Sequence, residues 1–170
     1  MAKASGRHPF LYYLAGLIWI VALVLLDQKI KELVVAQLKG ASAVSLVPGV
    51  LSLQYVENRG MAFGLLQDAR IFFIVSTILV AALLLLAYHA IPENKRFRAL
   101  SVGIVLILAG AIGNFIDRVR LGYVVDYFRL DFISFPVFNL ADCYITWTAV
   151  IMAILLVFFY KNEDIQQIHL

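Results

Sequence analysis

Four long apolar runs organise the chain, and polar segments separate them. The runs cover residues 10–26, 71–91, 99–116 and 143–160, and none of them contains Lys, Arg, Asp or Glu. Each is 17–21 residues long, which suits a helix that crosses a hydrocarbon core of about 30 Å. Because backbone polar groups in lipid must bond within their own segment, the pattern predicts four transmembrane helices in a single integral membrane domain.

The two longer polar segments carry a different pattern. Within residues 44–56 apolar and polar side chains alternate, which is typical of a strand, and Pro48-Gly49 indicates a turn. Residues 123–138 are rich in Tyr, Val, Phe and Ile, which favours a further strand or two. We therefore expect a small β-sheet on one membrane face. An interfacial amphipathic helix is the competing interpretation for residues 61–70.

The distribution of charge predicts the orientation of the chain. Four crossings put both termini on one side, where residues 1–9, 92–98 and 161–170 hold six Lys or Arg among 26 residues. The other side, residues 27–70 and 117–142, holds eight among 70. The basic excess predicts that the termini are cytoplasmic and that the longer segments face the periplasm or outside. The net charge of +3 lies on no soluble basic stripe, so nucleic acid is not an expected partner.

Composition agrees with lipid as the solvent of this chain. The sequence is 63% hydrophobic and 15% charged, with a mean hydropathy of +0.91. Average soluble domains are only about half apolar.

Polar residues gather at the outer ends of the last two predicted helices. Asn114 and Arg118 are four residues apart and share a helix face, while Asn139 and Asp142 are three apart at the start of the last helix. Packing of these two helices would bring the four side chains together, with Asp126 as a second carboxylate nearby. Taken alone, each aspartate fits a helix cap or interfacial anchor better than a catalyst.

Two neighbouring carboxylates have a characteristic chemistry. They cannot both ionise cheaply, so one pKa rises and the pair shares a proton. The ionised group can take a proton from a water that attacks a peptide carbonyl, and the protonated group can polarise the carbonyl oxygen and then protonate the leaving amine. Such a pair suits peptide hydrolysis, with Asp126 and Asp142 as the candidate catalytic groups. Arg118 and the two asparagines would orient the carboxylates and tune their pKa values, and we expect a supporting or structural role for Arg118.

Other site chemistries have less support in the sequence. Cys143 would need a histidine base, but His8, His89 and His169 fall on the opposite side of the predicted membrane. The same separation argues against a histidine-bound zinc ion, and no H-E-x-x-H motif occurs. We expect neither a metal nor a cofactor. A Ser–Lys pair from the outer segments remains open, because nothing fixes its spacing.

Two non-enzymatic interpretations also remain open. Transporters usually place polar groups near the bilayer midplane, whereas these helix centres are almost purely apolar. A structural membrane subunit would not explain why one rim holds so many Asn, Asp and Arg residues.

Five segments, in order, resemble the bacterial lipoprotein signal peptidases (signal peptidase II, aspartyl peptidase family A8). They are DQKIK at 27–31, NRGMAFG at 58–64, GAIGNFIDR at 110–118, GYVVDY at 122–127 and FNLAD at 138–142. The resemblance implies an endopeptidase of the bacterial inner membrane. Such an enzyme removes the signal peptide of a diacylglyceryl-modified prolipoprotein, cutting just before the lipidated cysteine. Lipid bilayer and prolipoprotein are the expected partners, and we expect a monomer.

The same resemblance implies roles for individual residues. Asp126 and Asp142 match the family's catalytic pair. The residues that match supporting or substrate-contacting positions are Asn114, Arg118, Asn139, Asn58, Gly60, Asp27 and Lys31. Asp27 and Lys31 are one helical turn apart, so a structural ion pair is the alternative to substrate contact. A small outer β-cradle and a mobile outer segment over the site are further implications.

Overall fold

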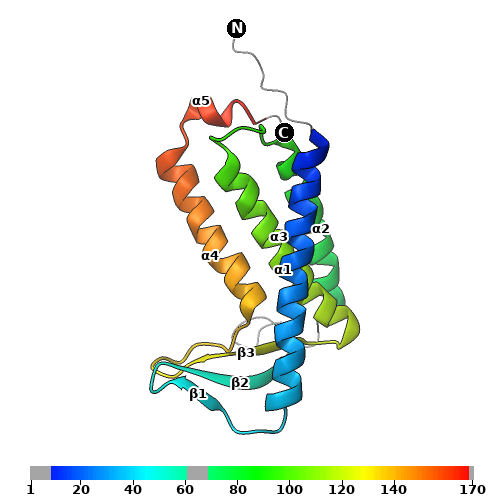
Figure 1. The fold of residues 1–170 in the computed structure, drawn as a ribbon, viewed down its shortest axis with the longest axis vertical. Coiled ribbons are helices and arrows are strands. Elements are labelled where there is room, and N and C mark those ends of the chain that lie inside the picture. Colours follow the sequence, from blue (N-terminus) through cyan, green and yellow to red (C-terminus); the bar gives the residue numbers. More distant parts are fainter. Residues whose placement is uncertain (1–8, 61–68, 169–170) are drawn as a thin grey trace.

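The computed structural model describes residues 9–60 and 69–168. Its helices are α1 (Pro9–Leu38), α2 (Arg70–Ala90), α3 (Arg98–Arg120), α4 (Leu140–Ile154), the π-helix η2 (Leu155–Phe159) and α5 (Asn162–Ile165), and its strands are β1 (Val44–Val47), β2 (Leu51–Asn58) and β3 (Val124–Leu130). The long helices form a bundle, with the sheet across one end and α5 at the other end, where α1 begins (Figure 1). Within the described residues four helices are long and apolar enough to span a membrane, which confirms the predicted fold class.

Helix α3 is the centre of the bundle. In its most apolar 18-residue stretch 56% of the residues are buried, against 11–17% in the other three long helices. It packs against α1, α2 and α4. Small residues allow the closest of these approaches, because a Cβ added at Gly110 would lie 2.5 Å from the Ala141 carbonyl oxygen of α4. The outward faces of α1, α2 and α4 keep large apolar side chains exposed, as lipid-facing helices do.

Helix α1 is longer than the sequence predicts. The apolar run stops at residue 26, but α1 continues for twelve more residues to Leu38. Asp27 and Lys31 are buried against the bundle at 0% and 3% exposure, so they lie within the helix and do not mark its end. At a 1.5 Å rise, 30 residues span roughly 45 Å. The last turns therefore extend beyond a core of about 30 Å, toward the sheet.

Helix α4 begins three residues earlier than predicted. Its N-cap is Asn139, whose side chain accepts a hydrogen bond from the Asp142 backbone N–H, while the Asp142 carboxylate accepts one from the Asn139 backbone N–H. Asp142 is thus the third residue of the helix, and the interpretation of Asp142 itself as the cap is wrong. This reciprocal capping box holds both polar side chains at the helix start.

The sheet is antiparallel, with the order β1-β2-β3. The predicted turn at Pro48-Gly49 joins β1 to β2, and Gly49 has a φ of +72°, which an L side chain rarely adopts. In the second segment β3 forms as expected, and Phe128 within it makes an isolated antiparallel bridge with Phe138. Most of the segment proposed as an interfacial helix, residues 61–68, lies outside the described residues.

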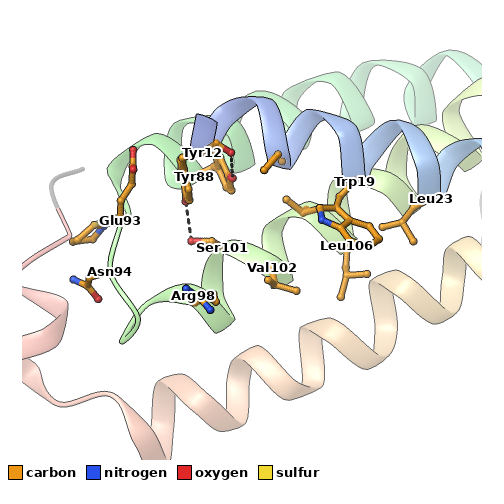
Figure 2. Close-up of a pocket in the computed structure, with 14 residues that line it drawn as sticks. Tyr12, Trp19, Leu23, Tyr88, Glu93, Asn94, Arg98, Ser101, Val102 and Leu106 are labelled. Atoms are coloured by element: carbon orange, nitrogen blue, oxygen red, sulfur yellow. Dashed lines mark hydrogen bonds between the residues drawn. The ribbon is translucent and has the colours of Figure 1, made fainter. Parts of the chain in front are cut away.

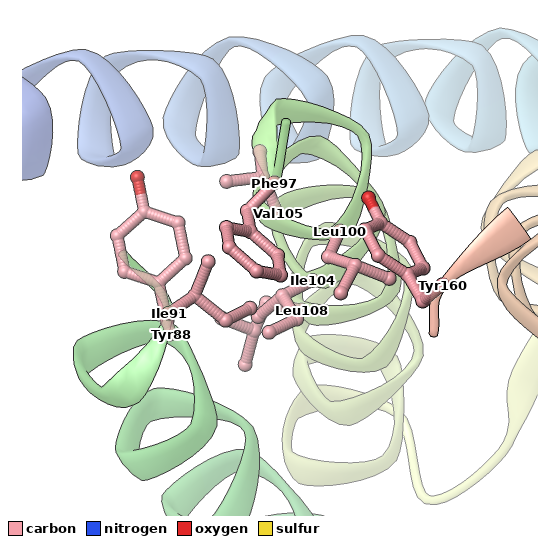
Figure 3. Packing of buried hydrophobic residues seen from close by; sticks show 8 residues of the cluster. All are labelled: Tyr88, Ile91, Phe97, Leu100, Ile104, Val105, Leu108 and Tyr160. Carbon is pink, nitrogen blue, oxygen red and sulfur yellow. The ribbon is translucent and has the colours of Figure 1, made fainter. Parts of the chain in front are cut away.

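Two apolar clusters hold the bundle together. The larger lies at the end away from the sheet and contains Tyr88, Ile91, Phe97, Leu100, Ile104, Val105, Leu108 and Tyr160 (Figure 3). The smaller contains Val34, Leu38, Val125 and Tyr127 and fixes the end of α1 against β3. The sheet is therefore packed onto the helices through the strand that carries Asp126.

We predict that Gly110→Ala lowers stability by about 1–3 kcal/mol, because the new Cβ meets a backbone carbonyl that cannot move without shifting α4. Gly103→Ala is the matched control on the same helix. Its Cβ would meet the Met152 Sδ, the far end of a flexible side chain. Both changes gain similar helix propensity, so thermal unfolding in detergent isolates the packing effect. Equal melting temperatures would contradict the close α3–α4 contact.

Candidate active site

Asp126 is buried where three segments converge. It lies in β3 at 1% exposure. Its Oδ2 accepts a hydrogen bond from Asn58 Nδ2 at 2.8 Å, and its Oδ1 accepts one from Asn139 Nδ2 at 2.6 Å. The β2–β3 register pairs Asn58 with Val124, two residues before Asp126, which explains the reach of that amide. Two amide donors thus hold both oxygens of the carboxylate.

Asp142 is held by the start of α4 and by α3. Its Oδ2 accepts a hydrogen bond from the Asn139 backbone N–H at 3.1 Å, and its Oδ1 accepts one from Asn114 Nδ2 at 2.8 Å. Asn139 Nδ2 also donates to Asn114 Oδ1 at 3.1 Å. The two asparagines therefore connect Asp126 to Asp142. Of the four side chains that the sequence predicts to meet, Asn114, Asn139 and Asp142 form one hydrogen-bonded network with Asp126, and Arg118 is not part of it.

Both carboxylates face a common cavity of about 570 Å³. Its polar wall also includes Asn58, Gly60, Asn114 and Arg118. Its remaining wall comes mainly from apolar side chains of α2, α3 and α4 and from the segment after β3, including Phe73, Val80, Ala111, Phe135, Ile145 and Trp147. The site is an apolar cleft with carboxylates and amides at one side.

A buried ion cluster lies directly behind the network. Lys31 Nζ is 3.0 Å from Asp27 Oδ2, 2.9 Å from Asp117 Oδ2 and 2.9 Å from Asn114 Oδ1. The lysine and both aspartates are at most 3% exposed. Asp117 Oδ2 also accepts a hydrogen bond from the Val125 backbone N–H at 3.1 Å. The cluster thus joins α1, α3 and the residue next to Asp126, which favours the structural ion pair over substrate contact for Lys31.

Lys31 also fixes the amide orientation of Asn114. The Asn114 oxygen accepts from both Lys31 and Asn139, so its nitrogen must point toward Asp142. A flipped amide would set an NH₂ group against two donors. The ion cluster therefore determines which group Asn114 offers to Asp142.

Sequence reasoning gave no role to Asp117 or Gln28. Gln28 Nε2 donates to Asp117 Oδ1 at 2.9 Å and to the Gly113 carbonyl oxygen at 3.2 Å. The sequence contains a signal for this cluster. If Asp27 pairs with Lys31, Asp117 on the facing helix is a further carboxylate without an assigned partner. The partners are more than 80 residues apart in sequence, so no local pattern pairs them.

Gly60 and Arg118 act at the edges of the site. The Gly60 backbone N–H donates to Asn58 Oδ1 at 3.0 Å, which directs the Asn58 nitrogen toward Asp126. The Arg118 guanidinium lies 4.6 Å from the centre of the Phe73 ring. Within residues 9–60 and 69–168 it makes no direct hydrogen bond or ion pair with either aspartate of the cavity, in keeping with a supporting place for this residue.

Burial and the charge of Asp142 raise the pKa of Asp126 to about 7, and the hydrogen bonds from Asn58 and Asn139 oppose part of that rise. Near neutral pH the buried carboxyl can therefore hold or release a proton. A raised pKa of this kind is expected for a buried carboxyl beside a second carboxylate.

The structure also bears on the rival chemistries. His89 Nδ1 is 2.7 Å from the Tyr13 hydroxyl, at the end of the bundle away from Cys143; His8 and His169 lie outside the described residues. In the described part of the chain, no three side chains of His, Cys, Asp or Glu are grouped so that they could hold a metal ion.

Comparison with known proteins gives the family. The family model for signal peptidase (SPase) II matches residues 19–159. The chain belongs to the signal peptidase II family. A lipoprotein signal peptidase of Streptococcus thermophilus is 43% identical over 145 residues, which cover 85% of this chain and 92% of the relative. One from Streptococcus pyogenes serotype M5 is 42% identical over 147 residues with the same coverage.

Solved structures agree with this assignment. Two bacterial membrane enzymes, determined by the in meso method at 2.3 Å and 1.9 Å, match with TM-scores of 0.73 and 0.74. Both are 31% identical to this chain. The match to the first covers 84% of this chain and 87% of that one, and the match to the second covers 86% and 94%. These matches confirm the resemblance seen in the sequence, and the signal peptidase II family is a family of aspartic endopeptidases. They do not support the transporter or the structural-subunit interpretation.

We predict that Lys31→Met destabilises the enzyme by about 3–5 kcal/mol, because Asp27 and Asp117 would remain buried without a counter-charge. Chemical or thermal unfolding in detergent measures the loss. Lys29→Met is the control, since Lys29 pairs with Glu32 on an exposed surface at 68% and 60% exposure and should change stability by less than about 1 kcal/mol.

A triple variant separates stability from activity. Replacing Asp27 and Asp117 by Asn together with Lys31→Met removes all three charges, so much of the stability should return. Peptidase activity should stay below that of the unchanged enzyme, because Asn114 has lost one of the two donors that orient its amide. Full activity in the stable triple variant would show that the cluster has no influence on the aspartates.

Proposed function

We propose that Asp126 and Asp142 are the catalytic pair of a signal peptidase II. The substrate is a diacylglyceryl-modified prolipoprotein, cut just before its lipidated cysteine. One observation carries the proposal: two carboxylates from different segments open on one cavity and are joined through Asn114 and Asn139. Asn58, Gly60 and Arg118 support the site, and Asp27 and Lys31 anchor it from behind.

The surroundings of the two aspartates suggest different roles. Asp126 is the more deeply buried, and its raised pKa suits the group that carries the shared proton. It would polarise the scissile carbonyl and then protonate the leaving amine. Asp142 lies in the first turn of α4, where the helix dipole stabilises a negative charge. It would accept the proton of the attacking water.

The cleft also suits a lipid-modified peptide. Its apolar wall lies along membrane-spanning helices, so the acyl chains of the substrate could remain among apolar side chains. The carboxylates lie at the sheet end of the bundle, where peptide and water can meet. Lipid chains would thus keep the cleavage site at the depth of the two aspartates, which is an effect of proximity.

The charge bias supports an orientation in the inner membrane. Lys95, Arg96 and Arg98 lie in or next to the α2–α3 turn, at the end opposite the sheet. Under the positive-inside rule this end is cytoplasmic, so both termini are cytoplasmic and the sheet and aspartates are periplasmic or outside. A monomer suffices for this proposal, because one chain supplies every residue of the network.

Asp126→Asn and Asp142→Asn should each reduce prolipoprotein cleavage at least a hundredfold, because each removes one partner of the proton exchange. Processing of a lipidated prolipoprotein by purified enzyme in detergent measures the rate. Asp131→Asn is the control: this aspartate follows the same strand but bonds to Ser52 and Arg129, away from the network. Rapid turnover by either active-site variant would overturn the assignment.

The pair should also give a defined pH dependence. Activity needs one proton on the pair, so kcat/KM should fall as the pH rises through about 7, where Asp126 loses its proton. Asn58→Ala removes a hydrogen bond that favours the ionised form, so the pKa of Asp126 should rise and the alkaline limb should move to higher pH. Gln54→Ala, on the same strand, should leave the limb in place. A shift to lower pH in Asn58→Ala would contradict the role of Asp126 as the acid.

A further inference from the structure

A second cavity, of about 590 Å³, lies between α1 and α3 at the end of the bundle away from the aspartates. None of the residues that line it lines the catalytic cavity. Figure 2 shows its polar residues, Glu93, Asn94 and Arg98, toward one end and Trp19, Leu23 and Leu106 farther along the helices. The cavity is therefore amphipathic along its length.

Two helical stripes form its walls. From α1 they are Tyr12, Ala15, Gly16, Trp19 and Leu23, and from α3 they are Arg98, Ser101, Val102, Val105 and Leu106. The first stripe runs from residue 12 to residue 23 and the second from residue 98 to residue 106, so at a 1.5 Å rise per residue the groove runs roughly 12–17 Å along the helix axes. That is about half of a 30 Å hydrocarbon core. The groove thus has the depth of one leaflet.

The groove is open to the bilayer from the side. Trp19 is 63% exposed and Val102 is 52% exposed, although both lie in membrane-spanning helices. A hydrogen bond of 2.8 Å from the Tyr12 hydroxyl to Ser101 joins the two helices near the polar end (Figure 2). The apolar part of the groove offers water few partners, so hydrocarbon is a more favourable occupant of it than water.

The polar end presents groups that suit a phosphodiester. Arg98 is exposed and, among the described residues, has no hydrogen bond or ion pair. Its neighbour Arg96, by contrast, is paired with Asp164 at 2.8 Å. Asn94 Oδ1 accepts from the backbone N–H groups of Arg96 and Phe97, which leaves its NH₂ group available to the groove. A guanidinium and an amide donor thus lie at the polar end of the groove, beside the ends of the membrane-spanning helices.

We propose that this groove binds one glycerophospholipid of the leaflet opposite the active site, with its phosphate on Arg98 and an acyl chain along Trp19 and Leu106. Charge complementarity carries the choice of occupant, because an unpaired guanidinium favours a phosphate oxygen. Glu93 disfavours additional negative charge there, so the rest of the headgroup is a neutral hydroxyl or a cationic amine. The lipid would fill the gap that α1 and α3 leave at this end.

The two tryptophans of the chain make the test specific. Trp19 lines this groove and Trp147 lines the catalytic cavity. In Trp147→Phe, Trp19 reports on the groove alone, and in Trp19→Phe, Trp147 reports on the other cavity. Brominated phosphatidylglycerol or phosphatidylethanolamine, titrated into the protein in detergent, should quench Trp19 saturably at one lipid per chain. Brominated diacylglycerol, which lacks the phosphate, should bind at least about tenfold more weakly.

Two matched pairs of variants complete the test. Arg98→Gln should weaken phospholipid binding about tenfold or more, whereas Lys95→Gln, an exposed cation of the same turn, should not. Ala15→Phe should fill the groove and abolish saturable quenching, whereas Ala82→Phe, on an exposed part of α2, should not. Quenching that never saturates, that is equal in Arg98→Gln, or that free inorganic phosphate competes away would overturn the proposal. Saturable quenching of Trp147 alone would do the same.

Discussion

The site depends on one buried ion cluster, in which a lysine lies between two aspartates inside a membrane protein. Charges away from water are costly unless they are paired and hydrogen-bonded. Lys31 therefore needs Asp27, Asp117 and the oxygen of Asn114 at the same time, and it has all three within 3.0 Å. Because these partners lie on α1 and α3, the cluster stabilises the observed register of the two helices. Gly113 makes the approach possible, since an added Cβ there would lie 2.5 Å from Asp27.

The amide groups of two asparagines orient the aspartates of the cavity, Asp126 and Asp142. Asparagine has a donor and an acceptor at opposite corners of one group, so fixing its oxygen also fixes its nitrogen. Lys31 fixes the oxygen of Asn114, whose nitrogen then holds Asp142. Gly60 does the same for Asn58, whose nitrogen holds Asp126. Neutral amides position both carboxylates without adding a cation that would keep both of them ionised.

The sequence predicts the parts of this structure that depend on length and periodicity. Four apolar runs gave four helices, and alternation with Pro48-Gly49 gave the hairpin. The prediction from sequence ended α1 too early, because charged residues such as Asp27 and Lys31 usually mark the end of a membrane span. In the structure both are buried, and their burial depends on a partner helix about 85 residues away. The prediction grouped Asn114, Asn139 and Asp142 correctly, since helix spacing brings them together. It could not say which amide meets which carboxylate, because that depends on the capping box of α4 and on the register of β2 with β3.

The two aspartates rest on different kinds of structure, which explains why the sheet lies at this end of the bundle. Asp142 belongs to a membrane-spanning helix, but Asp126 belongs to a strand whose position depends on packing. Val125 and Tyr127, on either side of Asp126, are buried against the last turns of α1, and the Val125 N–H bonds to Asp117. The extension of α1 beyond the apolar run therefore supplies the surface on which β3 docks. A chain that ended this helix at residue 26 would keep its four membrane spans, but it would lose the support that sets Asp126 beside Asp142.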